Sequence, residues 1–357
     1  MAAQRRRPTQ VDIARRVGVS QATVSLVISG GAASEQVAEG TRRSVLRAAA
    51  ELGYTVNAAA RRLKGGRNRM LGLYTFEPVF PVGQRDFYFP FLLGVEEATA
   101  EYGYDLLLFS SASSGGDRRI YAGGVNRLKV ADGCVLLGRH LHRDDLAALV
   151  QEDFPFVFIG RREVPGEELS YVAADYVGAT SAMVRDLTGL GHRRMAYLKL
   201  SDGQEPTRDR ESGFLQGLDA AGIPADLCLV HPMDDAGSVT ADLLREWRSA
   251  GVTALLVEPS EDDSTIVAVE RAAEAAGVRI PEDCSVVLLG DPALGENARE
   301  WTRFSLHREQ MGREAVRLLL DLLDDEDDGH RQLSVACTPI AGDSVAPPPA
   351  GPEGGAR

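Results

Sequence analysis

The sequence TQVDIARRVGVSQATVS, residues 9–25, decides the fold of the N-terminal part of the chain. Thr9 is a suitable N-cap for a first helix because Asp12, three residues later, can complete a capping box. The apolar residues of this helix lie mainly on one side, and Gly18 ends it, since glycine adopts a left-handed conformation at little cost. Ser20 then caps a second helix over residues 21–28, so the spacing predicts a helix-turn-helix.

The charge of the chain is divided unevenly along its length. The 357 residues carry a formal net charge of −13, which by itself argues against a nucleic-acid-binding protein. Residues 1–69, however, contain 13 Lys and Arg against 4 Asp and Glu, a balance of +9, which leaves −22 for the rest. A third helix is expected over residues 41–52. A plain helical hairpin is the alternative, but the basic surplus favours a DNA-binding module joined to an acidic domain.

The composition also indicates which classes of protein are not expected. No apolar run reaches the roughly 18 residues of a transmembrane helix, and no apolar signal segment follows the basic N-terminus. The four cysteines (Cys134, Cys228, Cys284 and Cys337) lack metal-ligand spacing and are expected to be free thiols. Walker A, G-x-S-x-G and H-E-x-x-H motifs are absent from the sequence. We therefore expect a cytoplasmic, nucleoid-associated protein that is not an enzyme and has no cofactor or metal.

From Met70 onward, apolar strands alternate with amphipathic helices, which predicts parallel sheets covered by helices on both faces. The expected strands are residues 71–76, 105–109, 133–137, 156–159, 195–200, 254–257, 285–289 and 333–337. The expected helices are residues 91–102, 118–130, 144–151, 179–190, 209–221, 238–249, 264–276 and 308–323. About 270 residues is long for one sheet, so we predict an α/β fold with two lobes and a ligand cleft at the carboxyl ends of the strands.

Three segments do not fit this pattern. Residues 56–69 predict a linker with a short hinge helix that begins at Asn57, and such a helix is too short to be stable alone. Residues 342–357 are rich in proline and glycine and are expected to be disordered. The acidic run at residues 324–328 is expected to be a solvated loop.

Many stretches of the chain, in this order, resemble the lactose-repressor (LacI/GalR) family of bacterial transcription regulators. The resemblance covers about residues 8–342. Its main carriers are residues 11–25, 41–46, 51–54, 57–63, 91–97 (FLLGVEE), 104–108 (YDLLL), 131–133, 191–196 (GHRRMA), 213–214 and 276–283 (AGVRIPED). The order and spacing of so many stretches make the resemblance specific.

The resemblance implies a domain organisation and partners. It implies a three-helix helix-turn-helix headpiece at residues 1–55, a hinge helix and linker at residues 56–69, and a two-lobe periplasmic-binding-protein-like domain at residues 70–341. The implied N-lobe comprises about residues 70–173 and 302–327, and the implied C-lobe about residues 174–301 and 328–341. The implied assembly is a homodimer that binds a pseudo-palindromic double-stranded DNA operator, with no membrane partner.

The resemblance places the base contacts on the second helix of the headpiece. Gln21 is suited to adenine and Ala22 to a thymine methyl group, while Thr23 and Ser25 are short donors for phosphate or base. The alternative is a helix face that is merely solvated. Leu26 stands where relatives often carry Arg, and leucine cannot make the bidentate contact that arginine makes with guanine, so the operator preference is not transferable from a relative.

The resemblance also implies that Leu63 in the hinge helix enters the minor groove and kinks the DNA. A simple packing role for this leucine is the alternative. The remaining implied DNA contacts are Thr9, Gln10, Ser20, Tyr54, Asn57, Ala60 and Arg61.

For the cleft, the resemblance implies an effector site built from aromatic, acidic and basic residues. The implied contacts are Phe87, Tyr88, Asp175, Arg208, Arg210, Asp262, Asp291 and Arg308. These residue types suit sugar ring faces and hydroxyl groups, although surface ion pairing is the alternative for each. Gly290 occupies the place of an Asp that often contacts the ligand in relatives, so the ligand chemistry can differ.

Together these features predict a ligand-responsive transcriptional regulator, most simply a repressor, whose operator affinity is controlled by a small effector that is a sugar or sugar derivative. A sugar-binding module without regulation is one alternative, and an enzyme on a two-lobe α/β fold is a second. The third is a family member that responds to a protein partner.

Overall fold

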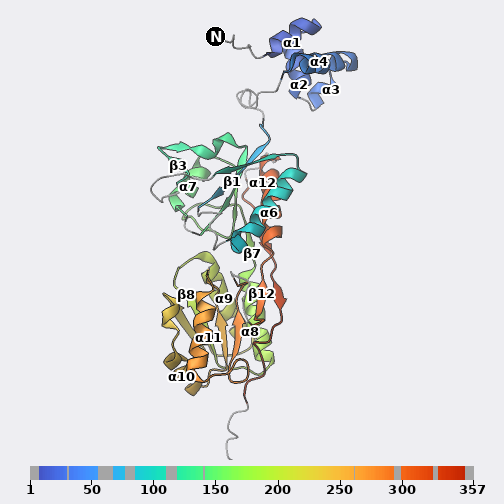
Figure 1. Ribbon diagram of the computed structural model, residues 1–357. Coiled ribbons are helices and arrows are strands. Elements are labelled where there is room, and N and C mark those ends of the chain that lie inside the picture. Colours follow the sequence, from blue (N-terminus) through green and yellow to red (C-terminus); the bar gives the residue numbers. More distant parts are fainter. Residues whose placement is uncertain are drawn as a thin grey trace, which may run out of the picture. The chain divides into compact units, whose positions relative to one another are not determined.

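The computed structural model describes residues 8–29, 32–54, 67–76, 85–109, 119–139, 141–260, 262–292, 299–324 and 329–349 (Figure 1). The chain divides into two compact units, residues 1–68 and residues 69–357. Each unit has its own hydrophobic core and is described by itself.

The first unit is a small helical domain with the predicted helix-turn-helix. Its helices are α1 (Gln10–Val17), α2 (Gln21–Ser29), α3 (Ala32–Glu35) and α4 (Glu39–Leu52). The predicted capping box is present, because Thr9 and Asp12 exchange side-chain and backbone hydrogen bonds. Gly18 ends α1 with φ of 76°, in the left-handed region. Buried Ile13 and Val24 pack with residues of α4 and fix the angle between the helices of the motif.

The second unit begins with an N-lobe built on a six-stranded parallel sheet in the order β13-β7-β6-β5-β1-β2. The strands are β1 (Met70–Thr75), β2 (Asp105–Phe109), β5 (Gly133–Leu137), β6 (Phe156–Ile159), β7 (Tyr171–Ala174) and β13 (Gln332–Val335). The N-lobe helices are α6 (Arg85–Glu101), α7 (Arg143–Gln151) and α12 (Arg308–Asp324). Two apolar clusters, one on each face of the sheet, bury its side chains beneath these helices.

The C-lobe repeats this architecture with the sheet order β14-β12-β11-β10-β8-β9. Its strands are β8 (Met195–Leu200), β9 (Leu229–Met233), β10 (Ala254–Val257), β11 (Ser285–Leu288), β12 (Thr302–Ser305) and β14 (Thr338–Ile340), and all are parallel to their neighbours except β14. Its helices are α8 (Tyr176–Gly189), α9 (Glu205–Ala220), α10 (Ala241–Ser249) and α11 (Ser264–Ala276). The prediction of two α/β lobes is therefore confirmed.

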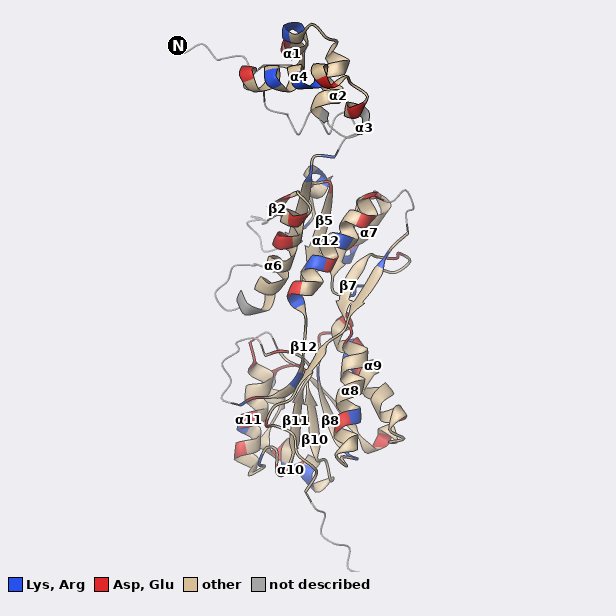
Figure 2. Cartoon of the chain, turned by 90° about the vertical axis from the view of Figure 1, so that its right-hand side faces the viewer, with Lys and Arg blue, Asp and Glu red and all other residues tan. Residues whose placement is uncertain are grey.

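Helices α6 and α12 lie side by side on the N-lobe, in close contact through two glycines (Figure 2). A Cβ atom at Gly94 would lie 1.9 Å from the carbonyl oxygen of Glu309, and one at Gly312 would lie 2.4 Å from that of Phe91. Only glycine permits this approach, so the crossing depends on both positions. It fixes the starts of α6 and α12, which carry residues of the cleft described below.

One predicted helix is wrong. Residues 119–130, expected to be helical, instead form a hairpin of β3 (Tyr121–Ala122) and β4 (Val125–Asn126), followed by a 3-10 turn at Arg127–Val130. Gly123 and Gly124 both have positive φ, which makes a two-residue hairpin turn there favourable.

The lobe boundaries also differ from those expected. Strand β12 (residues 302–305) belongs to the C-lobe sheet, and β13 (residues 332–335) belongs to the N-lobe sheet. The chain therefore crosses between lobes after Ala174, after Ser305 and after Val335. The hydrogen bonds of each strand decide its lobe, and these could not be read from the strand pattern alone.

The expectation of disorder from residue 342 onward is wrong for residues 342–349. Ser344 is fully buried, and its hydroxyl donates to the carbonyl of Val286 at 2.7 Å and accepts from the backbone N–H of Thr302 at 2.9 Å. The backbone of Ala346 is also hydrogen-bonded: its N–H donates to the Ser285 hydroxyl, and its carbonyl lies within hydrogen-bond distance of that hydroxyl and of the His192 Nε2. This stretch is therefore an integral edge of the C-lobe, while residues 350–357 lie outside the described part.

In the described ranges, every helix is either too short or too polar to cross a lipid bilayer.

Candidate functional site

The predicted DNA-contacting face of the first unit is exposed and partly ordered by its own hydrogen bonds. Ser20, Gln21, Ala22 and Leu26 are exposed at the start and along one side of α2. Gln21 donates from Nε2 to Oε1 of Gln10 at 2.9 Å, so two predicted contact residues on different helices hold each other. This bond presets the direction of an amide suited to an adenine edge.

The hydroxyl groups on this face also serve the helix ends. The Ser20 Oγ accepts from the backbone N–H of Thr23 at 3.0 Å and lies 2.8 Å from the Thr23 Oγ1. Thr9 is likewise engaged with Asp12, while Ser25 and Tyr54 are half-buried. The caps therefore fix the positions of several residues predicted to meet DNA. The predicted hinge contacts Asn57, Ala60, Arg61 and Leu63 lie outside the described residues.

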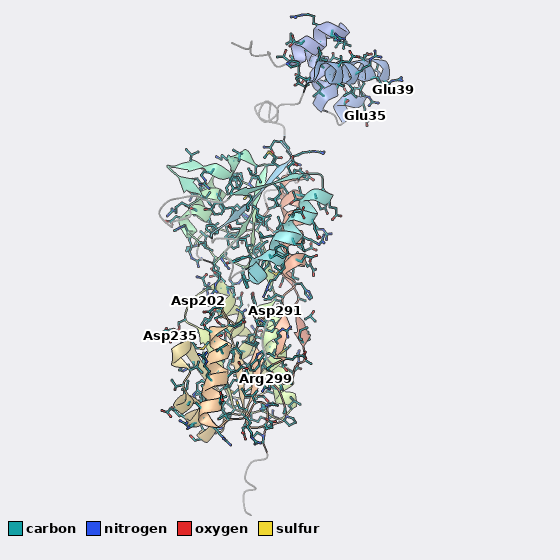
Figure 3. All side chains as sticks on the ribbon, viewed as in Figure 1. Glu35, Glu39, Asp202, Asp235, Asp291 and Arg299 are labelled. Atoms are coloured by element: carbon teal, nitrogen blue, oxygen red, sulfur yellow. The ribbon has the colours of Figure 1, made fainter. Side chains whose placement is uncertain are left out.

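The carboxyl ends of the strands of both lobes face one cleft of about 940 Å³, part of which is open to solvent. Figure 3 shows Asp202 and Asp291 at the end of the C-lobe that faces the N-lobe. Five of the eight predicted effector contacts line this cleft, namely Phe87, Tyr88, Arg210, Asp291 and Arg308. They come from α6, α9, the end of β11 and the start of α12, so residues far apart in sequence meet at one place.

Asp291 organises one side of the cleft. Its Oδ2 accepts from the Ser305 hydroxyl at 3.1 Å and from the Leu306 backbone N–H at 3.0 Å, and it lies 3.6 Å from Arg308. The Arg308 guanidinium lies over the ring of Phe87, 4.7 Å from its centroid. The carboxylate therefore ties the chain crossing at residues 305–308 to a charged and aromatic wall.

Arg210 lies beside the loop after β11 that carries Asp291. Its Nε donates to the carbonyl of Leu289 at 2.8 Å, and its guanidinium stacks on the ring of Tyr176 at 4.1 Å. Behind it, burial raises the pKa of Glu258, and the nearby charge of Arg210 opposes that rise. The same burial raises the pKa of Tyr197, whose hydroxyl donates to Glu258.

Three predicted effector contacts do not line the cleft. Asp175 caps α8 by accepting from the backbone N–H of Gly178 at 2.8 Å, and Asp262 accepts from that of Ser264 at 3.0 Å at the start of α11. Arg208 points to the rim, where it pairs with Glu163 at 2.8 Å. A carboxylate at the start of a helix can cap that helix or bind a ligand. The sequence alone did not distinguish these two roles.

The cleft also contains residues that were not predicted from the sequence. They share a position directly after a strand or at the start of the following helix. They are Arg139, Arg162, Tyr176, Asp202, Gln204, Thr207 and Ser260. The rule that ligands bind beyond the carboxyl ends of parallel strands would have found most of them from the predicted strand ends.

Comparison with known proteins shows which family this chain belongs to. The profile of bacterial regulatory proteins of the lacI family matches residues 9–57, and that of a periplasmic binding protein-like domain matches residues 184–345. The chain is 35% identical over 328 residues to the HTH-type transcriptional regulator CelR of Thermobifida fusca, covering 90% of this chain and 94% of the relative. The chain belongs to the LacI family of bacterial regulatory proteins.

Two solved structures extend the comparison to the fold of this LacI-family chain. A CelR–cellobiose complex matches with a TM-score of 0.61 at 30% identity, over 95% of this chain and all of that one. The lac repressor dimer bound to operator and the anti-inducer ONPF matches with a TM-score of 0.64 at 21% identity, over 96% of this chain, and supports the fold. The predictions of family, fold class and a ligand-responsive DNA-binding transcriptional regulator are confirmed.

Proposed function

We propose that this LacI-family regulator is a homodimeric repressor whose affinity for a pseudo-palindromic operator is controlled by a carbohydrate bound between the lobes. The observation that carries the proposal is the cleft itself, which collects aromatic and polar residues from both lobes. The cellobiose complex of a relative that aligns over 95% of this chain supports the ligand class.

The cleft chemistry suits a sugar of one or two rings. Phe87 provides ring surface for the apolar face of a pyranose, and the nearly buried ring of Tyr88 supports it edge to face, with 5.0 Å between the ring centroids. Asp202, Gln204 and Ser260 lie on the C-lobe side and offer hydrogen-bond donors and acceptors for hydroxyl groups.

Effector control requires that the sugar binds the two lobe arrangements with different affinity, because only that difference shifts the equilibrium. In the DNA-bound arrangement, the hinge segments of the two protomers would be held together and Leu63 would enter the minor groove. In the other arrangement, the hinge would melt and operator affinity would fall. This scheme follows from the short, marginal hinge helix predicted by the sequence.

The ligand class is tested by isothermal calorimetry of the full chain with cellobiose, maltose, glucose and a nucleoside. We expect one of the sugars to bind, and the Asp291→Asn variant to bind it at least tenfold more weakly. The matched control is Asp262→Asn, which changes a carboxylate outside the cleft and should leave affinity within about twofold. A folded, DNA-binding protein that binds none of the sugars would contradict the carbohydrate proposal.

A gel-shift assay with the DNA upstream of its own gene tests the regulatory part. We expect a specific complex whose affinity falls steeply with salt, because the basic headpiece neutralises phosphates. The absence of such a complex would favour a sugar-binding module without regulation.

A further inference from the structure

Several ion pairs connect the two lobes on the side of the cleft next to α9. All but one place the arginine on the N-lobe and the carboxylate on the C-lobe. These interlobe ion pairs are Arg139–Asp202 at 2.5 Å, Arg143–Glu205 at 2.8 Å, Arg161–Asp209 at 2.5 Å, Arg162–Glu205 at 3.7 Å and Arg208–Glu163 at 2.8 Å.

Glu205, the first residue of α9, is the centre of this cluster. Its side chain is fully buried, and its Oε1 accepts hydrogen bonds from two N-lobe groups, the Arg143 guanidinium at 2.8 Å and the backbone N–H of Glu163 at 3.1 Å. Arg208 of its own helix lies 3.6 Å from the same oxygen. Burial raises the pKa of Glu205, but the hydrogen bonds from its own backbone N–H and from Arg143 outweigh burial and leave the pKa lowered. A charged carboxylate of the C-lobe is therefore buried against the N-lobe.

The pairs differ in how much they can contribute. Arg208 and Glu163 are about half exposed, so water and salt screen their attraction. Arg161 and Asp209 are mostly buried and joined by two hydrogen bonds, of 2.5 and 3.0 Å. Because removal of one partner from a buried pair leaves an uncompensated charge, Glu205 and the Arg161–Asp209 pair dominate the cluster.

The three chain crossings, after Ala174, Ser305 and Val335, join the lobes next to β12 and β14. In the C-lobe sheet, β8, which leads into α9, is separated from β12 by β10 and β11. The cluster and the crossings thus join the lobes at different positions along the sheet, and Arg139, Arg162 and Asp202 line the cleft between the lobes. A rotation that opens the cleft about the crossings would separate the partners of the interlobe ion pairs.

We propose that the interlobe ion pairs form an electrostatic latch that holds the lobes together and sets the equilibrium between lobe arrangements, independently of which effector binds. Glu205 is its positioning residue: it anchors the α9 start, and with it the cleft residues Gln204 and Thr207, to the N-lobe. A latch made of buried charges must weaken when one of its charges is removed or reversed, and must recover when the opposite charge is supplied, whereas an apolar contact between the lobes would do neither.

Amide hydrogen exchange of the full chain tests the latch without effector or DNA, so the result is separate from the test of the proposed function. Asp209→Arg places a cation against Arg161 and should speed exchange at least tenfold in the segments that follow β5, β6 and β8. The double variant Arg161→Asp, Asp209→Arg restores the pair with reversed sign and should return exchange to within about threefold of the natural protein. Asp242→Arg disrupts an exposed pair with Arg245 inside α10 and is the matched control.

Glu205→Gln gives an independent test that preserves the shape of the buried side chain. It should speed exchange in the same segments. Unchanged exchange in folded Glu205→Gln, or no rescue in the double variant, would overturn the proposal. If Asp209→Arg does not fold, Glu205→Gln decides.

Discussion

The buried hydroxyl of Ser344 provides a direct test of the order assigned to the C-terminal stretch. Replacing Ser344 with Ala removes a donor to the Val286 carbonyl at 2.7 Å and an acceptor for the Thr302 N–H at 2.9 Å. Each buried backbone group left without a partner costs about 1–3 kcal/mol, so the loss is about 3 kcal/mol. For a domain of this size that corresponds to a fall in Tm of roughly 6–12 °C.

Calorimetric scanning of the full chain measures this effect in the transition of the C-lobe. The neighbouring change Asp343→Ala is the matched control, because it removes only an exposed carboxylate 3.3 Å from Arg299 and should cost less than about 0.5 kcal/mol. A fall in Tm of less than about 2 °C in Ser344→Ala would refute the argument. It would mean that water replaces the hydroxyl and that residues 342–349 do not seal the sheet.

Three further predictions concern pH, packing and DNA reading. Burial lowers the pKa of His192, so as pH falls through about 6.5 the unfolded chain binds a proton before the folded protein does, and the free energy of unfolding should fall. In urea unfolding between pH 7.5 and 5.5, His192→Gln should lose less stability than the natural protein. An equal loss in both proteins would contradict the role given to His192. Gly94→Ala should cost about 2 kcal/mol or more, since its Cβ would meet the Glu309 carbonyl, and an unchanged urea midpoint would argue against the close crossing. Gln21→Ala should weaken binding to a selected operator by roughly 5- to 150-fold in a fluorescence anisotropy titration while non-specific binding is kept, and uniform loss would indicate misfolding instead.

The sequence predicted those parts of the fold that depend on a few neighbouring residues, such as a helix end or a buried strand. The capping box of Thr9 and Asp12, the left-handed end at Gly18 and the buried strands of both sheets are examples. Strands β7, β9, β12 and β14 were not predicted; each is three to five residues long and lies at or next to an edge of its sheet.

The cleft was predicted less completely because its residues meet through tertiary contacts. Asp291 and Asp262 are both acidic residues soon after a strand, yet one lines the cleft and the other caps the turn before α11. The hydrogen-bond partners of each carboxylate depend on how the whole lobe packs, and a single sequence does not show that packing. Ser344 is a similar case, since a polar residue before a proline-rich run reads as disorder until the groups it satisfies are known.

Effector control is tested most directly by the affinity of the full-length protein for its operator, measured by fluorescence anisotropy with and without a saturating concentration of the sugar that calorimetry identifies. We expect the sugar to change operator affinity by at least about fivefold, and this change to require sugar concentrations at least tenfold higher in Asp291→Asn but not in Asp262→Asn. A sugar that binds the cleft of the natural protein and leaves its operator affinity unchanged would contradict effector control.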